Sequence, residues 1–217
     1  FILVLAVIVM ISKSNYINRS VRANRVFVRR FRSLHEHLVS MKQVEGVSPR
    51  ELAAIERSPL GRIYETGIEE LEVRREARGR RPLAGESVEA MRAAVDAVVV
   101  EENQKLDRWL VLLTIAISGG PFIGLLGTVL GVMNTFAGVA QAGDVNVNAI
   151  APGIAAALMA TIAGLACAIP SLFGYNYLNS RISALSDEMR VFVDRLITRL
   201  AEMQIEDAPP PVLQAAE

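Results

Sequence analysis

The feature that most constrains this chain is a long stretch with almost no charge. Residues 109–180 comprise 72 amino acids, and Asp144 is the only charged residue among them. All 23 lysines and arginines lie outside this stretch. A membrane-spanning helix needs roughly 20 apolar residues, so the stretch has room for two spanning helices joined by a turn. We therefore predict an all-α integral membrane protein.

Loop-forming residues mark the turn between the two predicted spans. Gly143, Asp144 and Asn146 are typical of a turn, which we place at residues 142–147 on the periplasmic side. The chain also opens with an apolar run that is too short to cross a membrane. No basic residue precedes this run and no small-residue cleavage site follows it, which argues against a signal peptide. We interpret it as the second half of a first transmembrane helix, in a chain that begins within that helix.

Positive charge is distributed unevenly around the spans. Nineteen of the lysines and arginines lie within residues 13–108, four follow Ser180, and none lies in the turn. Cytoplasmic loops are enriched in Lys and Arg, so we expect a periplasmic N-terminus and a cytoplasmic C-terminus. Equal totals of basic and acidic residues give no indication of nucleic-acid binding. The basic segment "NRSVRANRVFVRRFR" could contact RNA or lipid headgroups, but its place beside a membrane helix favours a topological and interfacial role.

Helical periodicity extends the spans into the cytoplasm. Apolar residues recur three, four and seven positions apart in residues 14–45, which predicts a continuation of the first helix. Ser48 followed by Glu51 has the capping-box arrangement that begins a helix, and Pro59 predicts a break. The polar sequence "RREARGRRPLAGE" predicts a loop. We expect the next helix to begin at Ser87 and to continue without a break into the second span.

A regular apolar stripe follows the third span. Its members alternate at spacings of three and four, which predicts a helix that packs on other helices; they are Ile182, Leu185, Met189, Val193, Leu196, Leu200 and Met203. The Pro-rich end of the chain is predicted to be disordered. The expected organisation is the end of a first transmembrane helix (1–12), a cytoplasmic helical region (13–108), a second transmembrane helix (109–141), the turn (142–147), a third transmembrane helix (148–180), a cytoplasmic helix (181–206) and a tail (207–217).

The residues that usually carry catalysis or bind metals do not form a recognisable set. The chain has no phosphate-binding loop, no paired carboxylates at catalytic spacing, and no Ser/His/Asp or Cys/His combination. His35 and His37 are two residues apart, which points them to different faces of a helix. Cys167 has no partner for a disulfide and no metal-ligand spacing. We therefore predict a protein that is not an enzyme and has neither a metal site nor a cofactor.

Small residues line both predicted spans. Association of helices in lipid relies on close packing and hydrogen bonds, which favours small residues at the contacts. The second span carries Gly124, Gly127 and Gly131, and the third carries Ala156, Ala160, Gly164 and Ala168. Packing within one subunit explains part of this pattern. Self-association into a ring around something small explains both stripes together.

Two threonines, Thr128 and Thr161, lie deep in the spans beside these small residues. A hydroxyl both donates and accepts hydrogen bonds, so a pair of hydroxyls can pass a proton or an ion along water. The alternative is that each threonine bonds to a carbonyl of its own helix, as membrane threonines often do.

These residues together resemble a known family. The segments "GPFIGLLGTVLGVMNTFAGVA" and "IAPGIAAALMATIAGLACAIPSLFGYN" are similar to the TolQ/ExbB/MotA proton-channel family, and within it to the TolQ/ExbB branch. The resemblance implies a bacterial inner-membrane subunit with three transmembrane helices, assembled as a pentamer around two copies of a single-span partner of the TolR/ExbD type. The partner's membrane Asp would carry the proton. Thr128 and Thr161 match the family's pore threonines, and Pro152 and the small residues would contact the partner or other helices.

The chain departs from the family pattern at two places. Family members of this branch typically have Glu at the sixth position of "APGIAA", where this chain has Ala156, and Gly119 and Gly120 are extra glycines that we expect to loosen the helix before Pro121. The resemblance implies a ring-forming channel or stator subunit of a proton-driven motor that works on the cell envelope or an outer-membrane transporter. The missing Glu leaves two alternatives open, a non-conducting scaffold for the partner and a Na⁺-driven variant.

Overall fold

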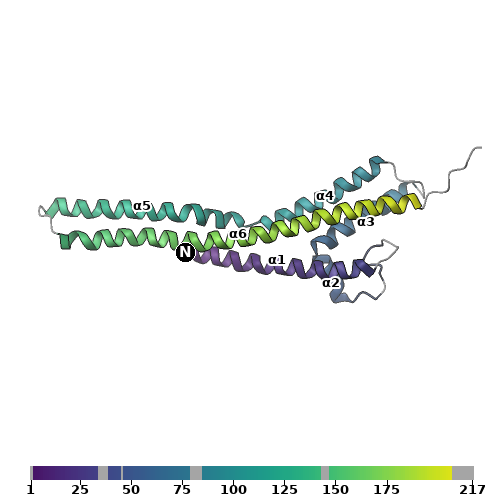
Figure 1. Ribbon diagram of the computed structural model, residues 1–217, viewed down its shortest axis with the longest axis horizontal. Helices are drawn as coiled ribbons and strands as arrows, with labels where there is room; N and C mark the ends of the chain where they lie inside the picture. The colour runs from purple at the N-terminus through teal and green to yellow at the C-terminus, as the bar shows by residue number, and fades with distance from the viewer. Residues whose placement is uncertain (1, 34–38, 45, 79–84, 143–146, 207–217) are drawn as a thin grey trace, which may run out of the picture. The chain divides into compact units, whose positions relative to one another are not determined.

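The computed structural model describes residues 2–33, 39–44, 46–78, 85–142 and 147–206. These residues form helices and contain no strand, which confirms the all-α prediction (Figure 1). The helices are α1 (Ile2–Ser33), α2 (Pro49–Arg57), α3 (Pro59–Arg78), α4 (Gly85–Asp107), α5 (Leu110–Ala142) and α6 (Val147–Glu206).

The contacts divide the chain into two compact units. The first, which we call the apolar unit, comprises Phe1–Asn15 and Asp107–Arg181, and the second, the charged unit, comprises Tyr16–Leu106 and Ile182–Glu217. Helices α1 and α6 are each divided between the two units, with one part in the apolar unit and the other in the charged unit.

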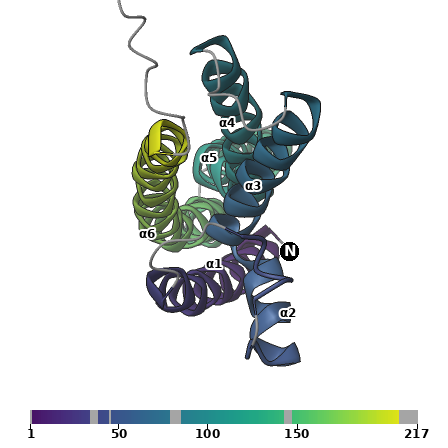
Figure 2. The same cartoon turned by 90° about the vertical axis from the view of Figure 1, so that its right-hand side faces the viewer.

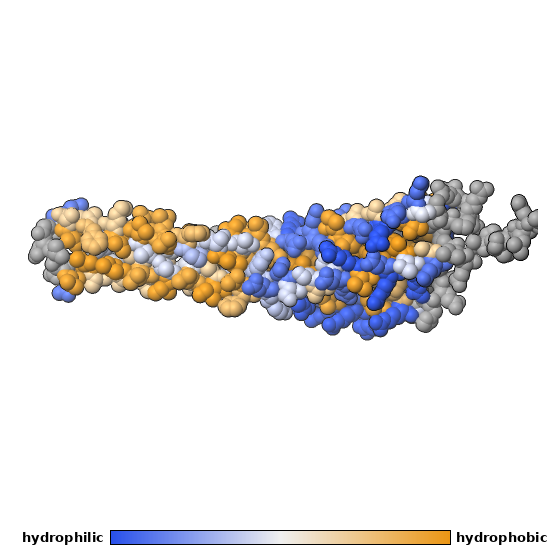
Figure 3. Space-filling view, turned by 45° about the horizontal axis from the view of Figure 1, so that its top comes forward, coloured by the Kyte–Doolittle hydropathy of each residue, from blue (hydrophilic) through white to orange (hydrophobic). Residues whose placement is uncertain are grey.

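In the described part of the chain, three helices are long and apolar enough to cross a membrane. They contain the candidate spans Ile2–Ser33, Leu110–Gln141 and Ile150–Glu202. Large apolar side chains of α5 and α6 lie on the outside of the apolar unit, with Phe122 71% and Phe173 70% exposed, and this apolar surface is visible in Figure 3. Such a surface is stable in lipid and unstable in water. The chain is therefore a multi-pass membrane protein, as predicted.

The membrane helices differ in detail from the predicted segments. Residues predicted as a third span (148–180) and a separate cytoplasmic helix (181–206) form one 60-residue helix, α6. Helix α5 continues through Gly119, Gly120 and Pro121 without interruption, so the expected loosening is absent there. The predicted turn (142–147) has its centre, residues 143–146, outside the described part of the chain.

The prediction of a continuous helix from Ser87 into the second span is wrong, because the chain breaks at Trp109. Helix α4 begins at Gly85 and ends at Asp107, and α5 begins only at Leu110. Trp109 has a φ of 74°, a left-handed conformation that is a genuine outlier for a bulky residue. Its carbonyl accepts a hydrogen bond from the amide of Leu112 at 3.1 Å, which starts the next helix. The Arg108 guanidinium carbon lies 5.2 Å from the centre of the Trp109 ring.

An aromatic cluster holds three helices of the charged unit together. Phe27 and Phe31 of α1 contact Tyr64 of α3 and Phe192 of α6, with ring centroids 5.4–5.6 Å apart. In Figures 1 and 2, α1 and α4 lie on opposite sides of this unit, with α3 and α6 between them. The predicted apolar stripe on α6 is buried from Ile182 to Leu200, which confirms it as a packing face.

The ends of the helices in the polar region agree with two predictions and differ from a third. The capping box is confirmed, because the Ser48 hydroxyl accepts from the Glu51 amide at 3.2 Å and the Glu51 carboxylate accepts from the Ser48 amide at 3.1 Å. The predicted break at Pro59 is confirmed as the start of α3. Helix α1 ends at Ser33 rather than continuing to residue 45, and residues 41–43 form a turn.

The prediction of a loop for "RREARGRRPLAGE" is partly wrong. Its first five residues complete α3, which ends at Arg78, and its last two begin α4 at Gly85. Its central residues, together with His35, His37 and the tail (207–217), lie outside the described part of the chain.

Candidate ion pathway between α5 and α6

Helices α5 and α6 approach each other so closely that only small residues fit between them. A Cβ added to Gly124 would lie 3.0 Å from the carbonyl oxygen of Ala160, and one added to Gly127 would lie 2.7 Å from the Ala160 Cβ. A Cβ added to Gly164 would lie 2.5 Å from the carbonyl oxygen of Gly120. Real Cβ atoms avoid contacts this short, so these glycines set the spacing of the two helices.

The predicted small residues do not all lie at this contact. Gly124, Gly127, Gly131, Ala160 and Gly164 meet within one subunit, as packing inside the subunit requires. A Cβ on Gly131 would lie 2.6 Å from that of Ala157, which is 2% exposed. Ala156 and Pro152 are exposed instead, on a different face of α6.

Three positions of the apolar unit were missed or misread in the sequence. Gly120, interpreted as an extra glycine, faces the backbone of Gly164. A Cβ on Gly153 would lie 2.2 Å from the Thr135 hydroxyl, and one on Gly174 would lie 1.9 Å from the Met10 sulfur, where α1 meets α6. The spacing of residues within one helix could not reveal the roles of Gly153 and Gly174, because in each case a single side chain on another helix requires the glycine.

The hydroxyls of Thr128 and Thr161 hydrogen-bond to each other across the helix contact. The Thr128 oxygen also lies 3.2 Å from the carbonyl oxygens of Gly124 and Ala157, and the Thr161 oxygen lies 3.3 Å from that of Gly124. Both threonines are half-buried. The structure thus joins the two residues that the sequence singled out.

Other hydroxyls of the spans behave differently. Thr114, Ser118, Thr135 and Ser171 each donate to the carbonyl four residues earlier in their own helix. Thr161 has carbonyl and hydroxyl partners on the opposite helix, and Thr128 has partners on both helices. The structure therefore separates this pair from threonines that only bond back to their own helix.

The Thr128–Thr161 pair offers more acceptors than donors. Two hydroxyl protons can be shared among the Gly124 and Ala157 carbonyls and the two hydroxyl oxygens themselves, so the direction of the bond between the hydroxyls can reverse. Reversal of this kind is what a hydroxyl needs in order to relay a proton. No carboxylate accompanies the pair, because the described residues of the two spans, 110–142 and 147–180, contain no Asp or Glu.

The described residues hold no group of three or more His, Cys, Asp or Glu side chains placed to bind a metal ion. Cys167 is buried with a free thiol in α6.

Comparison with known proteins identifies the family. Residues 55–191 match the model of the MotA/TolQ/ExbB proton channel family. The chain is 31% identical to the Tol-Pal system protein TolQ of Pseudomonas aeruginosa over 187 residues, which cover 86% of this chain and 78% of that protein. It is 30% identical to TolQ of Haemophilus influenzae over 203 residues, 93% and 85% of the two chains.

A shorter segment is similar to the other proteins of this branch. Over 66 residues the chain is 53% identical to the biopolymer transport protein ExbB of Pseudomonas putida, which covers 30% of this chain and 20% of that protein. Members of the family are membrane channel proteins and not enzymes. The chain belongs to the MotA/TolQ/ExbB proton channel family, in its TolQ/ExbB branch.

Proposed function

We propose that this protein is the ring-forming channel or stator subunit of an inner-membrane motor driven by the proton-motive force. The motor couples ion flow to mechanical work on the cell envelope or on an outer-membrane transporter. The observation that carries the proposal is the hydrogen-bonded pair Thr128–Thr161 at the centre of the α5–α6 contact. Membership of a proton-channel family supports it.

The proposal includes a single-span partner of the TolR/ExbD type. The described residues of the two spans lack a carboxylate, and Ala156 stands where the family resemblance places Glu. A proton carrier in the membrane must then come from elsewhere, and an Asp in the partner's span would supply it. Because a buried charge in a membrane is costly unless it is paired or hydrated, hydroxyls at the pathway would stabilise this Asp.

A second small face of α6 supports the presence of another helix. Its exposed small residues and prolines fall on one side of the helix and are Pro152, Ala155, Ala156, Ala163, Ala166 and Pro170. Helix α5 packs on a different face, and the proposed function assigns this one to the partner or to a neighbouring subunit. Small residues allow helices to approach closely in lipid. We propose a pentamer, with the N-terminus in the periplasm and the C-terminus in the cytoplasm.

Reconstitution of the complex in liposomes tests the proposal. The subunit should form rings with its partner by native mass spectrometry, and the complex should carry protons when a membrane potential is applied. Replacement of the partner's membrane Asp by Asn should abolish this flux without dissociating the ring. Intact rings that conduct no ion would support the scaffold alternative, and flux that requires Na⁺ would support the sodium-driven variant. Failure to form a ring would contradict the proposal.

A further inference from the structure

The charged unit carries a line of exposed arginines on α1. Their spacings of three and four residues place them on one face of the helix, opposite the buried side chains of Asn24 and Phe27. Helix α1 itself contains no acidic residue, and Glu51 of α2 is close enough to Arg29 to be affected by its charge. These residues, which we call the arginine face, are Arg19, Arg22, Arg25, Arg29 and Arg32.

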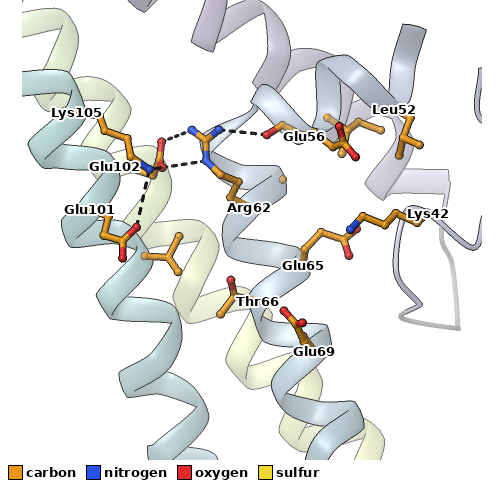
Figure 4. Close-up of a pocket in the computed structure, with 13 residues that line it drawn as sticks. Lys42, Leu52, Glu56, Arg62, Glu65, Thr66, Glu69, Glu101, Glu102 and Lys105 are labelled. Carbon is orange, nitrogen blue, oxygen red and sulfur yellow. Dashed lines mark hydrogen bonds and ion pairs between the residues drawn. The ribbon is translucent and has the colours of Figure 1, made fainter. Parts of the chain in front are cut away.

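A pocket with more acidic than basic side chains is formed by residues of α2, α3, α4 and the turn before α2. It has a volume of about 290 Å³ and is shown in Figure 4. Leu52, Ile55 and Val98 provide apolar surface, and no residue of α1 or α6 lines the pocket. Its charged residues are Glu56, Glu65, Glu69, Glu101 and Glu102, against Lys42, Arg62 and Lys105. Glutamates therefore outnumber cations here.

Two of these glutamates are occupied within the unit. Glu102 is 1% exposed and binds Arg62, whose Nε lies 2.9 Å from the carboxylate, and Lys105, whose Nζ lies 2.7 Å away. Glu65 accepts hydrogen bonds of 2.7 Å from the Ser40 hydroxyl and from the Met41 amide.

The remaining three carboxylates face outward around the pocket. Glu56, Glu69 and Glu101 are exposed. The nearest cation to Glu101 is Lys105, at 3.8 Å. We call these three side chains the glutamate rim. They can bind cationic side chains of another molecule, and the ion pair of Glu101 with Lys105 is too long to compete strongly.

The helix of the arginine face and a helix that lines the pocket contact each other within the charged unit. The rings of Phe27 and Tyr64 are 5.6 Å apart. Tyr64 precedes Glu65 in α3, and Arg62 of the same helix reaches Glu102. Arg25 and Arg29, on either side of Phe27 in sequence, therefore lie near the part of α3 that lines the pocket.

We propose that the arginine face of one subunit docks on the glutamate rim of the adjacent subunit, with Arg25 and Arg29 as the central contacts. The proposal rests on the ring described under the proposed function. A ring requires a heterologous interface, in which two different patches of the same chain meet. The axis of a membrane ring is the bilayer normal, and α1 is one of the spanning helices, so patches at the same level along α1 can meet.

Physical chemistry favours this contact. Arg–carboxylate pairs form strong, directed hydrogen bonds, and the arginine stems can cover the apolar side chains of Leu52 and Val98.

An anionic bilayer explains the arginine face less well. Arg29 lies 17 residues after Ser12, where the apolar run ends, which is about 26 Å along the helix at 1.5 Å per residue. The headgroup layer extends only about 5–8 Å beyond the hydrocarbon core, and the Debye length is about 8 Å in physiological salt. A typical tilt of about 20° shortens the distance by less than a tenth. Arg29 and Arg32 thus lie beyond the headgroup layer by more than a Debye length.

Crosslinking between subunits provides the first test. In a chain with Cys167→Ala, the pair Arg29→Cys and Glu69→Cys is treated with a short bis-maleimide in the intact complex. We expect a ladder of crosslinked species up to the full ring. A mixture of chains that carry only one of the two cysteines should give crosslinked dimers and nothing larger. The control pair is Arg195→Cys with Glu69→Cys, which should not crosslink, because Arg195 is exposed on α6, outside the arginine face of α1.

Charge reversal provides the second test. Arg25→Glu with Arg29→Glu, or Glu69→Lys with Glu101→Lys, should dissociate the ring at salt concentrations that leave the wild type intact. All four changes together should restore the wild-type salt tolerance, and Arg190→Glu with Arg195→Glu should have no effect. Native mass spectrometry measures the ring in each case.

The outcomes separate this proposal from the function on which it rests. Absence of any ring in the wild type contradicts the proposed function itself. Intact rings without the Arg29–Glu69 crosslink, and without rescue by the fourfold reversal, overturn only the contact. If reversal of the arginines abolishes binding to anionic vesicles and reversal of the glutamates has no effect, the arginine face binds lipid. That result also overturns the proposed contact between subunits.

Discussion

Gly164 of α6 and Gly120 of α5 face each other so closely that a Cβ on Gly164 would lie 2.5 Å from the Gly120 carbonyl oxygen. The contact involves backbone atoms, which cannot rotate away as the end of a flexible side chain can. It lies one helical turn from Thr161 and Gly124, so the spacing of the two helices here also fixes the distance between the threonine hydroxyls. Helix packing and the candidate pathway therefore depend on the same residues.

The first prediction concerns this contact. Gly164→Leu should separate α5 from α6, because overpacking a well-packed contact costs about 1–3 kcal/mol. We expect a lower thermal unfolding temperature in detergent and loss of the ring or of its partner. Gly119→Leu is the matched control, because a Cβ at Gly119 meets no atom within 4 Å. Equal stability of the two variants, with intact rings, would show that the close approach is unimportant.

The second prediction concerns Ala156. A charged side chain at the centre of a bilayer costs about 2.5–3.5 kcal/mol on insertion scales unless it is hydrated or paired. Ala156 is exposed on the second small face of α6, where the proposed function places the partner or a neighbour. We expect Ala156→Glu to fold and to alter ion flux in reconstituted liposomes.

Ala157 is the control for this change. It is 2% exposed and packs against Gly131, so Ala157→Glu should fail to accumulate in the membrane. If Ala156→Glu also failed to accumulate, position 156 would face lipid or a dry contact rather than a hydrated surface.

The third prediction concerns pH and the start of α2. Hydrogen bonds from the backbone and the hydroxyl of Ser48 lower the pKa of Glu51 below its ordinary value of 4.5. A lowered pKa in the folded state contributes stability above the unfolded value and loses it as the pH falls through the folded value. Local unfolding of α2, followed by hydrogen exchange, should therefore increase below about pH 4.5.

Two variants check the origin of this effect. Glu51→Gln should remove the pH dependence of exchange in α2. Ser48→Ala removes the side-chain cap, which typically costs about 1 kcal/mol, and should raise exchange at neutral pH as well. An acid response in α2 that persists in Glu51→Gln would have to come from another group.

Comparison of sequence and structure shows what patterns can predict here. Local chemistry was sufficient for the Ser48–Glu51 cap and for the buried stripe on α6, because each depends on spacing within one helix. Trp109 was not predictable, since neither Gly nor Pro marks the break and the left-handed conformation goes against the usual preference of a bulky residue. Which of the small residues on α6 face α5 was also not predictable. Ala156 and Ala157 are both small, and only the position of Gly131 on the neighbouring helix decides which one is buried.

The pairing of Thr128 with Thr161 lies between these cases. Their depth in the spans and their small neighbours are visible in the sequence, but the hydrogen bond between them depends on the register of α5 against α6. That register is set by the glycine contacts, including Gly120, whose role was not apparent. Sequence reasoning thus selected the residues, and the structure supplied the reason why they meet.

The last prediction concerns the threonine hydroxyls. Val has nearly the shape of Thr without its hydroxyl, and Ser keeps the hydroxyl and loses a methyl. Thr161 bonds to Thr128 and to the Gly124 carbonyl, both on the opposite helix. If the pair relays protons, Thr161→Val should abolish proton flux through the reconstituted complex, and Thr161→Ser should retain part of it. Ser118 donates only to the Thr114 carbonyl of its own helix, at 2.9 Å, so Ser118→Ala should leave flux unchanged. Native mass spectrometry must show that every variant forms the same complex. Equal flux in the wild type and Thr161→Val would remove Thr161 from the pathway and leave the hydroxyl pair as a packing contact, worth about 0.5–1.5 kcal/mol of stability.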